Sequence, residues 1–178
     1  MDVQYLIDAY RNKGVLVDTN LLLLLLVGTV ERSLITRYKR TQTYLPEDYD
    51  TLVRFLDQFA TRVTLPNILT EVSNLTDGID GKLKAQYVTI FRRATENLQE
   101  YYRASKDTAA SECFAGYGLT DAAILELSKG QYLLLTDDFR LSGYYSAHGG
   151  DVVNFNHIRI LNWPTNGCRV PATRCRVP

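Results

Sequence analysis

Short apolar runs and longer amphipathic stretches alternate along the chain. Four runs of three or four mostly apolar residues predict buried strands: residues 15–17, 63–65, 132–135 and 152–155. Around them, apolar residues gather in longer stretches, many of them recurring every three or four positions, which predicts helices over residues 2–12, 21–27, 46–59, 66–75, 82–103, 120–129, 139–147 and 157–161. Strands that alternate with helices predict an α/β fold, layered around a central and mostly parallel sheet.

The first strand leads directly into a candidate site. Asp18 follows Val15-Leu16-Val17 and precedes the apolar run 21–27, with Thr19 or Asn20 as the expected cap of the next helix. Open α/β sheets bind their ligands at the carboxyl ends of their strands, where Asp18 is expected to lie. An acid between two apolar runs is costly unless it is paired, hydrogen-bonded or metal-bound. Asp18 is therefore the first residue that needs an explanation.

The composition is typical of a soluble globular protein. The 178 residues are 46% hydrophobic and 22% charged, and we expect residues 1–162 to form one domain. Because Lys+Arg and Asp+Glu number 20 each, nucleic-acid binding would need a local basic patch. Basic residues gather over 32–40 and 82–103, where they either form a solvated surface or contact phosphates.

Cysteine usage and the chain start predict a cytoplasmic protein that does not enter a membrane. The three cysteines are odd in number and form no C-x-x-C pair, which favours a reducing compartment. The apolar run 21–27 is too short to span a bilayer, and the start resembles no secretory signal. The sequence Cys-Arg-Val-Pro occurs twice near the end, so residues 163–178 are expected to be a disordered tail, which could be artificial.

Four acids stand where a predicted strand ends or a predicted helix begins: Asp18, Glu71, Asp121 and Asp138. The carboxyl ends of parallel strands lie at one edge of a sheet, so these side chains could converge there. Clustered carboxylates repel one another and need cations, and hard oxygen ligands favour Mg²⁺ or Mn²⁺. Two such ions about 3.5–4 Å apart can activate water and stabilise the leaving oxygen in phosphodiester cleavage.

Each acid also has a simpler interpretation, which suits Asp18 least because apolar runs flank it on both sides. Asp121 and Asp138 could serve only as partners of a helix dipole, and Glu71 could be an ordinary surface residue. Other catalytic sets find less support, because His148 and His157 have no zinc-ligand spacing. The sequence also lacks a G-x-x-x-x-G-K phosphate loop.

The acids lie in four segments that resemble the signature segments of PIN domains, in the family's order. These are Val-Leu-Val-Asp-Thr-Asn at 15–20, Leu-Pro-Asn-Ile-Leu-Thr-Glu-Val at 65–72, Gly-Leu-Thr-Asp-Ala-Ala-Ile at 118–124 and Leu-Leu-Thr-Asp-Asp at 134–138. The resemblance implies a three-layer α/β/α sandwich with a metal-dependent ribonuclease site. It places Asp18, Glu71, Asp121 and Asp138 at the family's acidic positions, and Asn20, Thr136 and Asp137 among the polar neighbours that help hold metal or water.

The resemblance also implies a function and partners. It predicts a Mg²⁺- or Mn²⁺-dependent endoribonuclease acting on RNA, with a toxin of a toxin–antitoxin pair as the biological role. Such a toxin would have a small antitoxin protein as partner and would form a homodimer. Two alternatives stay open: a PIN-like RNA- or protein-binding module with weak or lost activity, and a structure-specific DNA nuclease.

Overall fold

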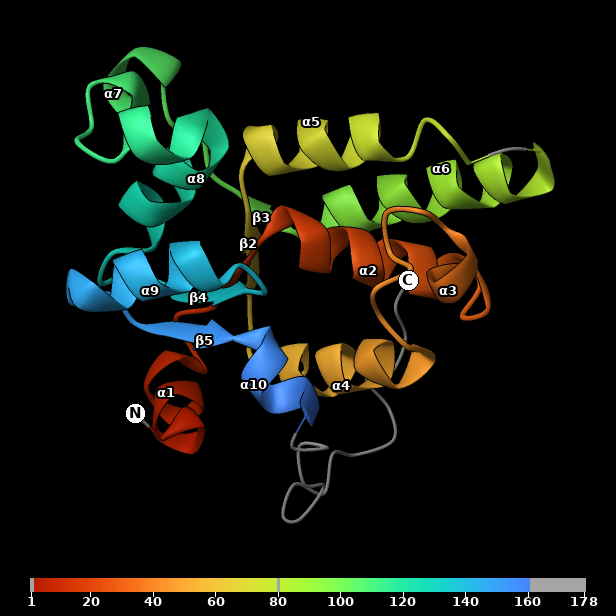
Figure 1. Cartoon of the computed structure of the whole chain (residues 1–178), viewed down its shortest axis with the longest axis horizontal. Coiled ribbons are helices and arrows are strands. Elements are labelled where there is room, and N and C mark those ends of the chain that lie inside the picture. Colours follow the sequence, from red (N-terminus) through yellow and green to blue (C-terminus); the bar gives the residue numbers. More distant parts are fainter. Residues whose placement is uncertain (1, 80, 161–178) are drawn as a thin grey trace.

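One five-stranded sheet forms the centre of the protein. The computed structural model describes residues 2–79 and 81–160. The strands are β1 (Val15–Val17), β2 (Arg62–Thr64), β3 (Gln99–Glu100), β4 (Leu133–Thr136) and β5 (Val152–Asn154). They run in the order β3-β2-β1-β4-β5, and all four neighbouring pairs are parallel (Figure 1). The predicted α/β architecture is confirmed, with a sheet that is wholly parallel.

Helices pack around this sheet in the three-layer arrangement that the sequence predicted. They are α1 (Val3–Tyr10), α2 (Thr19–Val30), α3 (Leu34–Arg37), α4 (Pro46–Leu56), α5 (Pro66–Leu75), α6 (Gly81–Asn97), α7 (Ser105–Ala109), α8 (Phe114–Ser128), α9 (Phe139–Ala147) and α10 (Phe155–Ile160). Proline occupies the first turn of α4 and of α5, where its missing N–H leaves no helical hydrogen bond unmade. No helix in the described ranges combines the length and the apolar character needed to cross a membrane.

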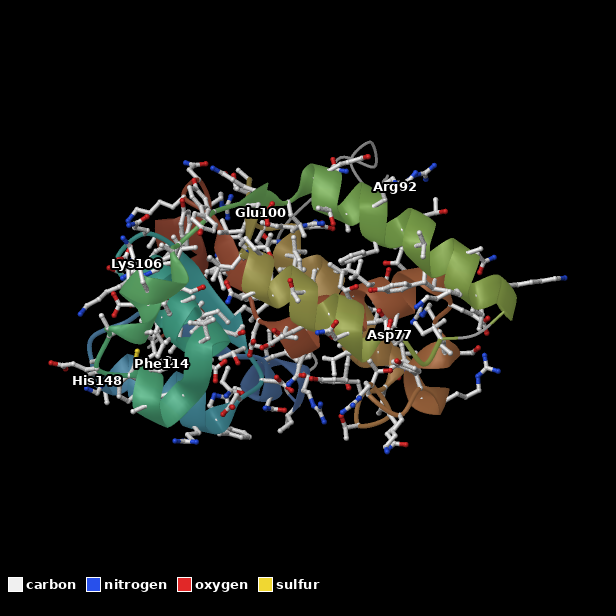
Figure 2. All side chains as sticks on the ribbon, turned by 90° about the horizontal axis from the view of Figure 1, so that it is seen from above. Asp77, Arg92, Glu100, Lys106, Phe114 and His148 are labelled. Carbon is white, nitrogen blue, oxygen red and sulfur yellow. The ribbon has the colours of Figure 1, made fainter. Side chains whose placement is uncertain are left out.

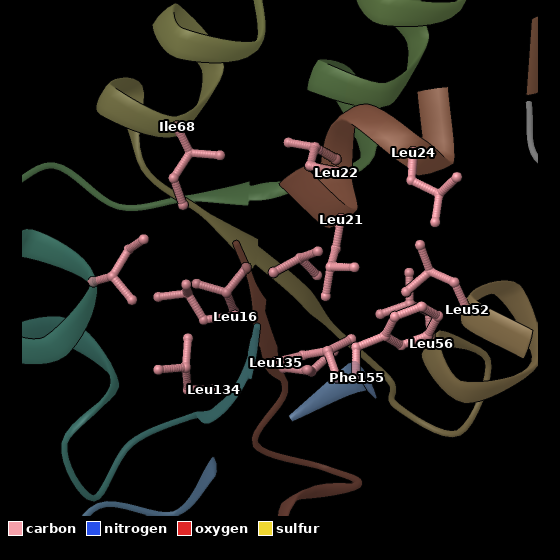
Figure 3. Close-up of a cluster of buried hydrophobic side chains, with 14 of the residues drawn as sticks. Leu16, Leu21, Leu22, Leu24, Leu52, Leu56, Ile68, Leu134, Leu135 and Phe155 are labelled. Atoms are coloured by element: carbon pink, nitrogen blue, oxygen red, sulfur yellow. The ribbon is translucent and has the colours of Figure 1, made fainter. Parts of the chain in front are cut away.

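The apolar run after Asp18 forms α2, which lies between α5 and α6 on one side and α4 on the other (Figure 1). A helix that is apolar on all sides belongs in an interior, and its leucines contact side chains from the sheet and the neighbouring helices (Figure 3). Gly28 lets α4 approach closely, because a Cβ atom there would lie 2.3 Å from the Tyr49 ring. The core therefore fixes α2, and with it the position of Asp18.

The strand order reverses at a defined place, where α/β proteins commonly bind ligands. From β1 the chain builds β2 and β3 on one side, then returns to build β4 and β5 on the other. In open α/β sheets, ligands bind outside the carboxyl ends of the strands where this order reverses. The reversal lies between β1 and β4, whose last paired residues are Val17 and Leu135. Asp18 and Thr136-Asp137-Asp138 follow immediately.

Several predicted element boundaries were wrong. The helix predicted over 82–103 ends at Asn97, and the chain then forms β3, whose two exposed polar residues lack the apolar pattern of a strand. The helix predicted to reach 59 ends at Leu56, and the last helix begins at Phe155 rather than 157. Helix α7 was not predicted. The tail expected at 163–178 lies outside the described residues.

Two predicted helix starts were also wrong. The cap of α2 is Asp18 itself, whose carboxylate accepts a hydrogen bond from the Thr19 amide, rather than Thr19 or Asn20. The helix predicted over 120–129 begins earlier, since α8 starts at Phe114 and is broken at Gly118, whose φ of 80° and ψ of −176° suit glycine.

Candidate functional site

Asp18 stands at the carboxyl end of β1 and is only 6% exposed. Its Oδ1 accepts a hydrogen bond from the Thr19 amide at 2.6 Å, and its Oδ2 accepts one from the Thr136 hydroxyl. Burial raises the pKa of Asp18 to about 7; these two hydrogen bonds oppose the shift, and repulsion from Asp121 and Asp137 adds to it. The structure therefore holds a carboxyl in a position where its negative charge is unfavourable.

Glu71 bridges three helices through its carboxylate. The side chain comes from α5 and is half-buried. Its Oε2 accepts a hydrogen bond from the Thr19 hydroxyl at 2.9 Å, and its Oε1 accepts one from the Thr120 hydroxyl at 2.6 Å. Thr19 belongs to α2 and Thr120 to α8. Glu71 is therefore a fixed member of the site and not a free surface residue.

Asp121 and Asp138 form the other side of the cluster. Burial raises the pKa of Asp121 to about 6, with added repulsion from Asp138 and Glu71, while Arg140 opposes the shift. Asp138 is exposed and caps α9, because its Oδ1 accepts hydrogen bonds from the amides of Arg140 at 2.6 Å and Leu141 at 3.0 Å. The simpler role of a helix cap is thus confirmed for Asp138, which also lies near enough to repel Asp121.

Asp137 lies near Asp18 and has hydrogen-bond partners of its own. Its Oδ1 accepts a hydrogen bond from the Asn20 side-chain amide at 3.2 Å, and its Oδ2 accepts one from the Tyr44 hydroxyl. The side-chain amide of Asn156 also donates to the Asp137 carbonyl at 2.6 Å. Burial raises the pKa of Tyr44, and the nearby Asp137 adds to the shift. Tyr44 therefore serves as a hydrogen-bond donor to Asp137.

Thr136 connects the two parts of the cluster. Its hydroxyl donates to Asp18 and accepts from the Asp138 amide at 3.0 Å. The two supporting residues predicted from the sequence, Asn20 and Thr136, thus both contact a predicted acid. Sequence analysis missed Thr19 and Thr120, although each adjoins a candidate acid. It also missed Tyr44, which lies in a loop with no motif around it.

The basic segments expected to contact RNA are largely engaged with the protein's own acids or exposed to solvent. Arg32 pairs with Asp50, and Arg37 pairs with Glu31 at 2.8 Å. On α6, Arg92 points away from the body of the protein (Figure 2). Closer to the carboxylates, the Arg140 guanidinium donates to the Gly116 carbonyl at 2.8 Å, and its charge acts on Asp121.

The carboxylate cluster consists of Asp18, Glu71, Asp121, Asp137 and Asp138. Within residues 2–79 and 81–160, none of the five forms an ion pair with a lysine, arginine or histidine. Burial and mutual repulsion raise the pKa of Asp18 and of Asp121, and a bound cation would relieve both effects. The oxygen-only donor set fits Mg²⁺ or Mn²⁺ by its chemistry.

The spacing of these acids restricts how an ion could be held. In the described part of the chain, no three His, Cys, Asp or Glu side chains are grouped so that they could hold one ion. Mg²⁺ commonly binds through one or two carboxylates together with several waters and substrate phosphates. The cluster fits that open mode of binding and does not fit a closed, all-protein cage.

Comparisons of the chain with protein-family models, with curated proteins and with solved structures found no match.

Proposed function

We propose that this protein is a Mg²⁺- or Mn²⁺-dependent endoribonuclease that hydrolyses RNA phosphodiester bonds. One observation carries the proposal: Asp18, a buried acid whose pKa is raised by burial and by the nearby Asp121 and Asp137, directly follows β1 at the strand-order reversal. A buried acid without a cationic partner is costly to the fold. Such a cost is common at functional sites, where side chains are arranged for chemistry rather than for stability.

Hydrogen bonds hold the proposed catalytic side chains in fixed orientations. The Thr19 amide and the Thr136 hydroxyl orient both oxygens of Asp18, while two threonine hydroxyls orient both oxygens of Glu71. When bound, a divalent ion would lower the pKa of a water and offset the phosphate charge. One or two of the carboxylates Asp18, Glu71, Asp121 and Asp138 would hold it, together with water and the substrate phosphate. The fixed orientation lowers the reorganisation needed during the reaction.

Single-stranded RNA is the substrate form that we propose, because its bases and backbone are accessible to a surface crevice. Arg140 is the basic side chain best placed to contact the phosphate backbone. It is exposed, its charge acts on Asp121, and its guanidinium lies 4.6 Å from the centre of the Tyr117 ring. A planar guanidinium held in this way suits phosphate recognition.

The test is cleavage of a labelled single-stranded RNA with Mn²⁺, with EDTA, and with the variant Asp18→Asn. Asparagine is as good a helix cap as aspartate, so this change removes the charge and retains the cap. Asp8→Asn is the matched control, because Asp8 is an exposed acid of α1 whose partners are Gln4 and Arg11. Cleavage that needs both the metal and Asp18, and survives Asp8→Asn, supports the proposal. A folded wild-type protein that neither cuts RNA nor binds Mn²⁺ contradicts it.

The open spacing of the acids favours a second candidate, an RNA- or protein-binding module with weak or lost nuclease activity. RNA binding without any metal-dependent cleavage would support this candidate. The toxin role, the antitoxin partner, the homodimer and the cytoplasmic location stay predictions from the sequence. Cleavage of a matched single-stranded DNA in the same assay would decide whether the substrate is DNA instead of RNA.

A further inference from the structure

A cavity of about 380 Å³ lies beside the carboxylate cluster, between α9, β5 and α1. Two of its lining residues connect it to the cluster. Phe139 directly follows Asp138, and Asn154 is the register partner of Thr136 on the neighbouring strand. Because β4 and β5 are parallel, the end of the cavity at Asn154 lies at the same sheet edge as the carboxylates.

The lining combines an exposed aromatic ring with apolar walls and a few polar groups. Phe139 is 62% exposed, and its ring lies 5.7 Å from the ring of His157, tilted by 56°. Val3 and Leu6 of α1 contribute apolar wall. The Ser142 hydroxyl, which accepts a hydrogen bond from the Asn154 side chain at 2.8 Å, adds a polar group. Small-ligand sites typically have this composition and volume.

A flat heteroaromatic ring is the ligand that this lining suits. Phe139 is an exposed aromatic ring that lines the cavity, and proteins that bind single-stranded nucleic acid commonly stack its bases on such rings. The cavity is of the size of a small-molecule site, and it adjoins carboxylates proposed to act on a phosphodiester.

We propose that this cavity binds one unstacked base of single-stranded RNA, next to the phosphate that is cut, with the base stacked on Phe139. The inference rests on the proposed function and adds a base-binding pocket and a residue that positions the RNA. Phe139 has no part in the chemistry: it would set which phosphate reaches the carboxylates.

Gly143 provides a way to block the cavity without harming the fold. It lines the cavity on α9, and a Cβ atom built on it meets no other atom within 4 Å. The larger side chain of Gly143→Leu would therefore extend into open space. Leucine is also a better helix former than glycine, so the melting temperature should stay the same or rise.

The experiment measures binding of a fluorescent single-stranded RNA in two conditions: to the Asp18→Asn protein with Mg²⁺, and to the wild-type protein with EDTA. Each further variant is compared with its parent protein in both conditions. We expect Phe139→Ala and Gly143→Leu each to weaken binding about tenfold or more, and Phe139→Tyr to retain it. Tyr5→Ala is the matched control: Tyr5 is 66% exposed on α1 and does not line the cavity, so binding should not change. Removing the base from one nucleotide of the RNA should weaken binding to wild type but add no further loss in Phe139→Ala.

The outcomes separate this inference from the proposed function. If cleavage needs Mn²⁺ and Asp18 while Phe139→Ala and Gly143→Leu bind RNA like wild type, the base pocket is wrong and the nuclease stands. If these two variants change the oligomeric state instead of RNA affinity, the cavity is a contact between copies of the chain, and the inference is again overturned. A wild-type protein that neither binds nor cuts RNA overturns both proposals.

Discussion

Asp18 and Asp138 occupy equivalent places in two halves of the sheet, yet their surroundings differ. Each follows a central parallel strand and caps the helix that comes next. Asp138 is exposed and accepts from two amides of the first turn of α9, as a typical cap does. Asp18 is buried and accepts from the amide of the adjacent Thr19. The same local pattern thus gives a good cap where the acid is solvated and an unfavourable charge where it is buried.

The largest expected effect is that of replacing Asp18, and it should appear in the rate of RNA cleavage. If the proposed function holds, Asp18→Asn should lower metal-dependent RNA cleavage by at least about a hundredfold, because a fixed charge in a water-poor site is lost. Its melting temperature in EDTA should not fall, since the cap is retained and a buried charge is removed. Cleavage rates and thermal unfolding of the same preparation test both statements. A stable variant that cleaves like wild type would remove Asp18 from the mechanism.

The burial of Asp18 should also make the stability of the protein depend on pH. The folded chain holds the Asp18 proton up to about pH 7, whereas an unfolded aspartate releases it near 3.8. The folded state therefore binds more protons in this window, so the contribution of Asp18 to stability falls as pH rises from about 4 to 7. The shift corresponds to a few kcal/mol as an order of magnitude.

Denaturant unfolding in EDTA between pH 4 and 8 measures this effect. The stability of Asp18→Asn relative to wild type should increase across the window and level off above pH 7. Mn²⁺ should then raise the melting temperature of wild type more at pH 8 than at pH 5, because the ion competes with the proton. A constant difference between variant and wild type at every pH would show that Asp18 has an ordinary pKa.

Thr136 joins the two acids, so changing it should affect both. Thr136→Val leaves Asp18 Oδ2 and the Asp138 amide without the hydroxyl that each contacts. We expect a loss of about 1–3 kcal/mol in the free energy of unfolding, the usual range for a buried polar group left unpaired. Thr136→Ser keeps the hydroxyl and serves as the control. Equal stability of the Val and Ser variants would show that the bridge contributes nothing.

Local patterns predicted the strands that bear this site well, because β1 and β4 are short apolar runs that end at an acid. They failed for β3, whose Gln99 and Glu100 join the sheet only through backbone hydrogen bonds to β2. The candidate acids could be found because each follows a strand or lies near a helix start. Long-range partners could not, since nothing near Tyr44 in the sequence indicates that it will reach Asp137, 93 positions away.

Burial distinguishes Asp18 from Asp138, and burial depends on the whole fold. The sequence places both acids after an apolar strand, so their patterns look alike. Asp18, at the start of the enclosed helix α2, is buried, whereas Asp138, at the start of α9, is exposed. A pattern of single residues carries no information on which helix will be covered by others.

The smallest expected effect separates the two roles of Asp138. Asp138→Ala removes the cap of α9 and should lower stability by about 1 kcal/mol, within the usual range for lost caps. Asp138→Asn retains the cap and should leave stability almost unchanged, yet it should weaken cleavage, because the charge facing Asp121 is gone. Thermal unfolding and cleavage assays of both variants give the two readouts. If Asp138→Asn cleaves RNA like wild type, Asp138 is only a helix cap, and the catalytic set reduces to the acids around Asp18.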